Sequence, residues 1–165
     1  MIELKRAAVG DAELLVSLKV SAFGVEKRLY GYAPPEHDSV EHQTQVLQDE
    51  KAQYYVIWQD ETPIGGTCTV EKAQGEYYIS SLYIGEDWQN TGAGSEVLKQ
   101  LFARYPNAVK WTLETPYKSV RNHHFYEKLG FVKVGETEPE ADGFYLFLYE
   151  KNIPRNWEEI VPANT

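Results

Sequence analysis

The sequence predicts a single mixed α/β (α+β) domain with a largely antiparallel central sheet flanked by helices. Three stretches rich in β-branched and aromatic residues follow one another closely, at residues 54–58, 64–72 and 77–84. Only a few turn-forming residues separate them, and connections this short join antiparallel strands. Amphipathic segments lie before and after this meander. The expected element order is β-α-α-β-β-β-α-β-α-β-β.

The N-terminal third is expected to hold one strand and two helices. Residues 2–8 alternate in the manner of a short strand. A helix follows that Asp11 caps and that ends near Phe23. Residues 24–39 are interpreted as a loop, because they contain a glycine and two consecutive prolines. The second helix is expected over residues 40–49.

The C-terminal half alternates helices and strands. Apolar side chains recur at helical spacing after Gly94, and Pro106 ends this helix. A further helix is expected to be capped by Ser119 and to end at Gly130. The remaining strands are expected over residues 109–114, 131–134 and 144–150.

Length and composition limit the class of protein. A chain of 165 residues fits one domain, which we place at residues 1–150, with a C-terminal tail at 151–165. The net charge of −9 argues against nonspecific binding to nucleic acid. No apolar run reaches about 18 residues, so no membrane span is expected. Cys68 is the only cysteine, and the N-terminus lacks the layout of a signal peptide, which together favour the cytoplasm.

The stretch QNTGAG, at residues 89–94, joins a predicted strand to a predicted helix. The first backbone N–H groups of a helix have no partner within the helix and carry the positive end of its dipole. Gly92 and Gly94 have no side chain to keep an anion away from the backbone. The segment is neither a dinucleotide fingerprint, because a third glycine is missing, nor a P-loop, because no Gly-Lys-Ser/Thr follows. A pyrophosphate is therefore the expected ligand, although a plain tight turn has the same composition.

Three motifs in order resemble the GNAT superfamily of N-acetyltransferases. Residues 89–94 fit its Gln/Arg-x-x-Gly-x-Gly/Ala pattern position by position. The preceding SLYIGEDWQ is similar to the family's strand ending in Leu-Tyr-Val. The following NHHFYEKLGF is similar to the family's Asn-x-x-x-x-Tyr-x-x-x-Gly-Phe. The resemblance covers roughly residues 1 to 150 and implies the fold predicted above.

The resemblance implies acetyl-CoA, or another acyl-CoA, as co-substrate, with its pantetheine arm between the fourth and fifth strands. It implies that the backbones of Leu82 and Ile84 bind the arm and the acetyl carbonyl, and that Asn122 binds the arm or the adenosine part. It also implies that Tyr126 gives a proton to the departing thiolate. The pyrophosphate would lie on the backbone amides of Gln89, Asn90, Thr91, Gly92, Ala93, Gly94 and Ser95. Arg121 and Lys128 are available to the phosphates, although basic residues on an exposed helix need no such reason.

The general base is the weakest point of the resemblance. Many family members have a glutamate a few residues before the Leu-Tyr-Val strand end, where this chain has only tyrosine, isoleucine and serine. The nearest carboxylate is Glu76, at the start of the strand. Glu114, at the end of the next strand, is the alternative catalytic residue, and a chain of water molecules is equally possible.

Other reactive residue types point to structural roles. Cys68 lies in a predicted strand and is expected to be buried rather than nucleophilic. His123 and His124 are adjacent, so on a helix they point about 100° apart, and no metal site is expected. Tyr30 and Tyr32 fall in the region that walls the acceptor site in the family.

The expected function is transfer of an acetyl group from acetyl-CoA to a primary amine by direct attack in a ternary complex. The alternative is a non-catalytic module that senses acyl-CoA. The sequence does not distinguish a small-molecule amine from a peptide amine as the acceptor. A homodimer is a further expectation, because the tail carries several apolar residues: Ile153, Trp157, Ile160 and Val161.

Overall fold

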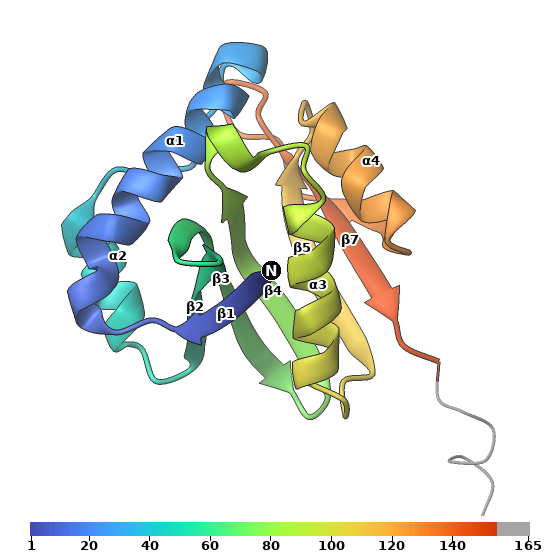
Figure 1. Ribbon diagram of the computed structural model, residues 1–165. Helices are drawn as coiled ribbons and strands as arrows, with labels where there is room; N and C mark the ends of the chain where they lie inside the picture. The colour runs from blue at the N-terminus through green and yellow to red at the C-terminus, as the bar shows by residue number, and fades with distance from the viewer. Residues whose placement is uncertain (155–165) are drawn as a thin grey trace, which may run out of the picture.

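The computed structural model, which describes residues 1–154, has one seven-stranded sheet with helices on both faces (Figure 1). Its strands and helices follow the order that the sequence predicts. They are β1 (Ile2–Arg6), α1 (Ala12–Tyr30), α2 (Val40–Gln48), β2 (Ala52–Gln59), β3 (Thr62–Ala73), β4 (Glu76–Ile84), α3 (Ala93–Arg104), β5 (Lys110–Pro116), α4 (Val120–Lys128), β6 (Val132–Glu136) and β7 (Leu146–Asn152). Two short 3₁₀ helices, η1 (Val9–Asp11) and η2 (Glu86–Trp88), precede α1 and α3.

The strand order in the sheet is β1-β2-β3-β4-β5-β7-β6, and only the β4–β5 pair is parallel. The predicted fold class is thereby confirmed. Strands β4 and β5 pair only through residues 76–78 and 110–112. Both strands continue beyond this pairing, β4 to Ile84 and β5 to Pro116. The sheet is therefore open between their C-terminal halves.

Both faces of the sheet are covered, and β2 shows why its sequence is apolar throughout. Tyr55 and Ile57 point into the core that α3 covers, whereas Tyr54 and Val56 point into the core that α1 covers. Successive side chains of a strand alternate between faces, so a strand buried on both sides needs an uninterrupted apolar run. The run YYVI meets this requirement.

Helix α1 is longer than the sequence predicts, and the expectation that residues 24–39 form a loop is wrong for the first seven of them. The helix continues through Gly24 and ends at Tyr30, where Gly31 adopts a left-handed conformation with φ of 75°. A glycine in this conformation commonly follows the last turn of a helix. The extension adds two turns to α1 and brings Glu26 onto it.

The expected cap of α1 is also different in detail. Asp11 occupies the position before the helix, but its carboxylate accepts a hydrogen bond from the backbone N–H of Ala8 at 2.8 Å. It therefore closes the turn of η1 rather than the first turn of α1. Strand β7 ends at Asn152, two residues past the expected domain boundary.

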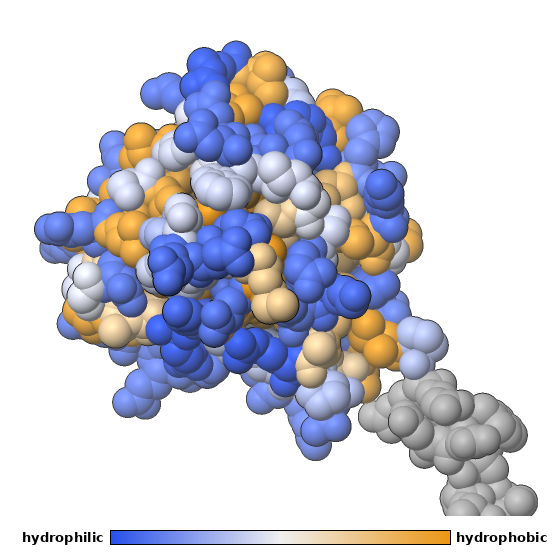
Figure 2. Space-filling view, in the orientation of Figure 1, coloured by the Kyte–Doolittle hydropathy of each residue, from blue (hydrophilic) through white to orange (hydrophobic). Residues whose placement is uncertain are grey.

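The expected dimer contact falls mostly outside the described residues. Ile153 packs against the core that α3 covers, whereas Trp157, Ile160 and Val161 lie beyond residue 154. The homodimer therefore stays a prediction. On the face drawn in Figure 2, hydrophilic side chains are interspersed with apolar ones. Within residues 1–154, none of the helices combines the length and the apolar character that crossing a membrane requires.

Gly65 of β3 allows the close approach of β4, and a substitution there tests this packing. A Cβ atom on Gly65 would lie 2.1 Å from the backbone oxygen of Tyr83, which can move only with its strand. We expect Gly65→Ala to lower the free energy of unfolding by about 1–3 kcal/mol in urea denaturation. Gly10→Ala is the control, because a Cβ atom there meets nothing within 4 Å. Equal stability of the two variants would contradict this account of the β3–β4 contact.

Candidate active site

Two neighbouring cavities open where β4 and β5 separate. The first, of about 410 Å³, extends under the loop that follows α1 and is called the loop-side cavity. The second, of about 490 Å³, extends along the glycine turn at residues 89–95 and is called the turn-side cavity. Strand β4 and helices α1 and α4 contribute walls to both.

The two cavities share part of their lining, and this shared wall marks where two ligands would meet. Its members come from α1, β4 and α4, and they are Phe23, Glu26, Leu82, Asn122 and Tyr126. Three of them, Leu82, Asn122 and Tyr126, are residues that the sequence predicts for the site. A ligand in one cavity can therefore reach a ligand in the other beside a tyrosine, an amide and a carboxylate.

The glycine turn has the backbone geometry of an anion site. Asn90 and Gly92 are both left-handed, with φ of 61° and 86°. Within the described chain, no acceptor is present for the backbone N–H groups from Asn90 to Ser95. Gln89 differs from the expectation, because its own N–H already donates to the Glu86 carbonyl oxygen at 3.3 Å. The unpaired amides therefore begin at Asn90.

Gly92 and Gly94 are required in the turn for different physical reasons. A Cβ atom on Gly92 would meet nothing within 4 Å, so it is the left-handed backbone that requires glycine there. A Cβ atom on Gly94 would lie 3.0 Å from Cζ of Phe125. The absence of a side chain at Gly94 thus gives room to a ring of α4.

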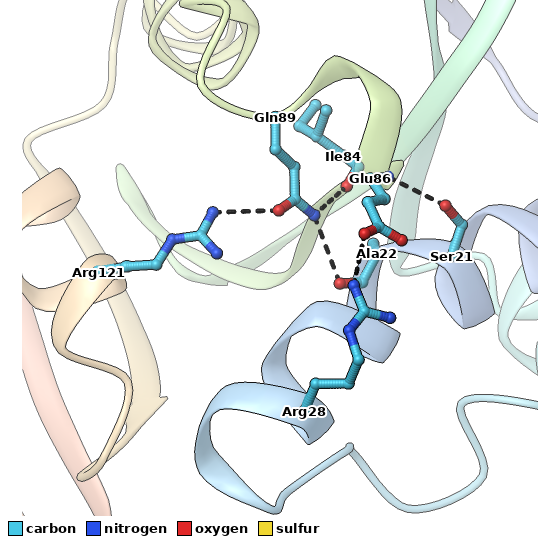
Figure 3. A network of polar contacts seen from close by, with 7 residues as sticks. All are labelled: Ser21, Ala22, Arg28, Ile84, Glu86, Gln89 and Arg121. Carbon is cyan, nitrogen blue, oxygen red and sulfur yellow. Dashed lines mark hydrogen bonds and ion pairs between the residues drawn. The ribbon is translucent and has the colours of Figure 1, made fainter.

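The side chain of Gln89 links three elements around the site (Figure 3). Its Nε2 donates to the carbonyl oxygens of Ile84, at 2.8 Å, and of Ala22, at 3.4 Å. Its Oε1 accepts a hydrogen bond from Arg121 at 3.0 Å. One amide thereby joins the end of β4 to α1 and to α4. The Gln of the family-like pattern is a structural residue in this fold.

Tyr126 and Asn122 lie on one face of α4, as their spacing predicts. Tyr126 is only 8% exposed, and its ring packs edge-on against Phe125 and Phe131. Burial, with a smaller contribution from nearby Glu26, raises the pKa of the Tyr126 hydroxyl well above its usual value. The Nδ2 of Asn122 donates to Oγ1 of Thr115 at 3.3 Å.

Glu26 is the functional candidate that sequence reasoning missed. Its Oε2 accepts a hydrogen bond from the buried hydroxyl of Ser119 at 2.9 Å, so Ser119 does not cap α4 as expected. Among residues 1–154, no ion-pair partner is found for Glu26. The sequence analysis ended α1 at Phe23 and so left Glu26 in a loop. The spacing Phe23, Glu26, Tyr30 would have placed it on the inner face of a longer helix.

Glu114 and Glu76, the two carboxylates near the predicted site in the sequence, occupy different positions in the fold. Glu114 is exposed on β5 and lines the loop-side cavity, but it does not line the turn-side cavity. Glu76 is at the opposite end of β4, where it pairs with Lys110 at 3.3 Å. Glu76 therefore lies away from both cavities.

Basic side chains gather around the turn-side cavity. Arg121, His124 and Lys128 all line it, and all three come from α4. Together with the free amides of the glycine turn, Arg121 and Lys128 outweigh the one carboxylate of this lining, Glu26, in a protein of net charge −9. Such a lining favours an anionic ligand.

Other residues that the sequence analysis singled out have structural surroundings. Cys68 is buried, and burial raises the pKa of its thiol, which agrees with the expected structural role. His123 donates from Nε2 to the Pro116 carbonyl oxygen at 3.0 Å. Tyr32 lines the loop-side cavity, whereas Tyr30 accepts a hydrogen bond from the Arg121 backbone N–H at 3.5 Å. Within the described part of the chain, no cluster of three potential metal ligands occurs.

Residues 20–131, more than half of the chain, match the model of the acetyltransferase (GNAT) family. The chain belongs to this family, and the resemblance seen in its motifs is confirmed. A Bacillus subtilis protein of uncharacterized function, YrkN, is 34% identical over 79 residues, which span 47% of this chain and 43% of that protein.

Solved structures share the fold at low identity. An acetyltransferase from Thermus thermophilus superposes with a TM-score of 0.76 at 18% identity, over 93% of this chain and 97% of that one. The ribosomal-protein-S18-alanine N-acetyltransferase of Escherichia coli superposes with a TM-score of 0.75 at 16% identity, over 98% of this chain and 100% of that one. The PaiA N-acetyltransferase of Thermoplasma acidophilum was solved in complex with coenzyme A. It superposes with a TM-score of 0.72 at 18% identity, over 93% of this chain and 99% of that one.

The structural role of Gln89 can be tested by stability. Gln89→Ala removes three hydrogen bonds and leaves the Ile84 carbonyl and the Arg121 guanidinium without this partner. We expect a loss of about 1–3 kcal/mol in the free energy of unfolding. Gln45→Ala, on the exposed face of α2, is the matched control and should change stability little. Two equally stable variants would show that Gln89 does not hold these elements together.

Proposed function

We propose that the protein transfers an acetyl group from acetyl-CoA to a primary amine while both are bound. The observation that carries this proposal is the wall of five residues that the two cavities share. A ternary complex needs two binding sites that meet at the reacting atoms, because direct attack requires the amine to approach the carbonyl carbon closely. Membership of the acetyltransferase (GNAT) family supports the same reaction. The acetyltransferase domain would extend to residue 152, because β7 ends at Asn152.

The turn-side cavity is assigned to acetyl-CoA. The pyrophosphate would lie on the backbone N–H groups of residues 90–95, and Arg121 and Lys128 would complement its charge. The pantetheine arm would follow β4, where Leu82 and Ile84 line the cavity, with Asn122 opposite. A backbone N–H of β4 could then stabilise negative charge on the acetyl oxygen.

The loop-side cavity is assigned to the amine. Its nitrogen must be neutral to attack the carbonyl carbon, so a proton has to leave it. Glu26 is the better placed proton acceptor, because it alone among the carboxylates of residues 1–154 lines both cavities. Glu114 lines the amine cavity and is the second candidate.

Tyr126 is assigned the opposite proton transfer. When the nitrogen–carbon bond forms and the carbon–sulfur bond breaks, the thiolate of coenzyme A departs and gains from a proton. The Tyr126 hydroxyl is protonated at neutral pH and can donate, and burial raises its pKa further above the usual value. Its position on the shared wall gives it access to both ligands.

The substitution Tyr126→Phe tests the proton donor. The ring and its packing are kept, while the transferable proton is lost. We expect kcat to fall by about 10²–10⁴-fold, the usual range for general acid catalysis, with little change in the affinity for acetyl-CoA measured by calorimetry. A kcat within about threefold of wild type, with chemistry rate-limiting, would remove Tyr126 from the catalytic role.

The substitution Glu26→Gln tests the proton acceptor, with Glu114→Gln as the matched control. We expect kcat of Glu26→Gln to fall by about 10²–10⁴-fold near neutral pH. The deficit should shrink as the pH approaches the pKa of the free amine, about 10 for an alkylamine, because more of the amine is then already neutral. A deficit that is constant with pH would identify Glu26 as structural. A larger loss in Glu114→Gln would transfer the role to that residue.

A family member without catalysis would bind acetyl-CoA but release no thiol. Thiol release from acetyl-CoA in the presence of small-molecule amines and peptide amines therefore separates the enzyme from an acyl-CoA sensor. The presence of Tyr126 and Glu26 on the shared wall supports the enzyme.

A further inference from the structure

Helix α1 presents a cation as well as a carboxylate to the loop-side cavity. Lys19, Phe23 and Glu26 all line it, at positions i, i+4 and i+7 of the helix. Residues with this spacing share a helical face, and seven residues extend about 10 Å along the axis. Glu26 is on the wall shared with the turn-side cavity, whereas Lys19 lines the loop-side cavity alone. The cavity thus has opposite charges along one wall.

Lys19 has no counter-charge in the part of the structure that is described. It takes part in none of the ion pairs found among residues 1–154. Its Nζ lies 5.7 Å from the centroid of the Tyr83 ring, a contact that does not neutralise it. Burial lowers the pKa of Lys19, and the thiol of Cys68 opposes this to a smaller extent. Burial raises the pKa of that thiol, so Cys68 is neutral at physiological pH.

Apart from Glu114, the other charged groups and histidines of the loop-side cavity have partners of their own. Glu26 accepts the hydrogen bond from Ser119 and lies on the catalytic side. The Nδ1 atom of His42 lies 2.8 Å from a carboxylate oxygen of Glu36. The Nδ1 atom of His37 donates to the Pro34 carbonyl oxygen at 2.9 Å. Glu114 is exposed on β5 and faces Tyr78.

We propose that Lys19 binds an anionic group of the acceptor, so that the enzyme acetylates amines that also carry a carboxylate or a phosphate. The inference rests on the proposed function, because the acetylated nitrogen has to lie beside Glu26 and Tyr126. The acidic group then extends along α1, past Phe23, to Lys19. A half-buried ammonium without a partner is costly, and an acidic group of the acceptor removes that cost. The bound acceptor therefore bridges the two charges of the helix.

The test compares three series of amines of four to eight carbons in a thiol-release assay with acetyl-CoA. The first carries a carboxylate or a phosphate at the far end, the second a methyl group, and the third a second amine. We expect kcat/KM to be at least about tenfold higher for the acidic series, the effect of a hydrogen bond to a charged group. The better of the carboxylate and the phosphate identifies the anion.

Variants of Lys19 assign this preference to the residue. Lys19→Met keeps most of the side-chain volume and should raise KM for the acidic amines by about tenfold or more, while the methyl-ended amines change little. Lys19→Arg should keep the preference. Lys27→Met, on the exposed face of the same helix, is the matched control. Hexanoate, which has no amine, should inhibit the wild type in competition with the acceptor and inhibit Lys19→Met less.

Three results would overturn the inference. Methyl-ended amines or diamines that react as well as the acidic amines would exclude a role for an anionic group, while the proposed acetyl transfer to amines would stand. An equal loss for all three series in Lys19→Met would show that Lys19 is structural. No thiol release with any series would contradict the proposed function itself, and the inference with it.

Discussion

Strands β4 and β5 share hydrogen bonds only at residues 76–78 and 110–112, and the position of every proposed site residue depends on this short pairing. The closed end is held by stacked rings, with Tyr77 and the fully buried Trp111 5.2 Å apart between centroids. Each strand is also held on its outer side by an antiparallel neighbour, up to Ile84 on β4 and Pro116 on β5. The opening is therefore a fixed feature of the sheet. Both cavities lie against this opening because β4 and β5 do not pair with each other beyond residues 78 and 112.

Helix α1 and the glycine turn complete the site from opposite directions. The turn gives the acidic protein a positive cavity through free backbone amides and the basic residues of α4. Helix α1 packs against β3 and β4 and brings a carboxylate to the place where the two cavities meet. The amide of Gln89 joins these parts, since its hydrogen bonds reach β4, α1 and α4 at once. In the proposed function, binding of the coenzyme and placement of the acceptor would thus depend on the same few contacts.

Much of the fold and part of the candidate site could be predicted because their signals are local. The alternating strands, the turn at residues 89–95 and the spacing of Asn122 and Tyr126 are all readable over short stretches. Glu26 was not predictable by the same means. Gly31 and the two prolines after it indicate a loop locally, whereas α1 continues to Tyr30, and its last turns make tertiary contacts from Glu26 to Ser119 and from Arg28 to Glu86. The unpaired state of Lys19 also depends on tertiary contacts, which no periodicity in the sequence reports.

The central claim is that the coenzyme and the acceptor meet at the wall formed by α1, β4 and α4. A crystal structure of the protein with coenzyme A bound tests it most directly, through the position of the sulfur atom. We predict a pyrophosphate within hydrogen-bonding distance of the backbone N–H groups of residues 90–95, and a sulfur within reach of the Tyr126 hydroxyl. A coenzyme bound outside the turn-side cavity, or a sulfur separated from both Tyr126 and Glu26, would contradict the account.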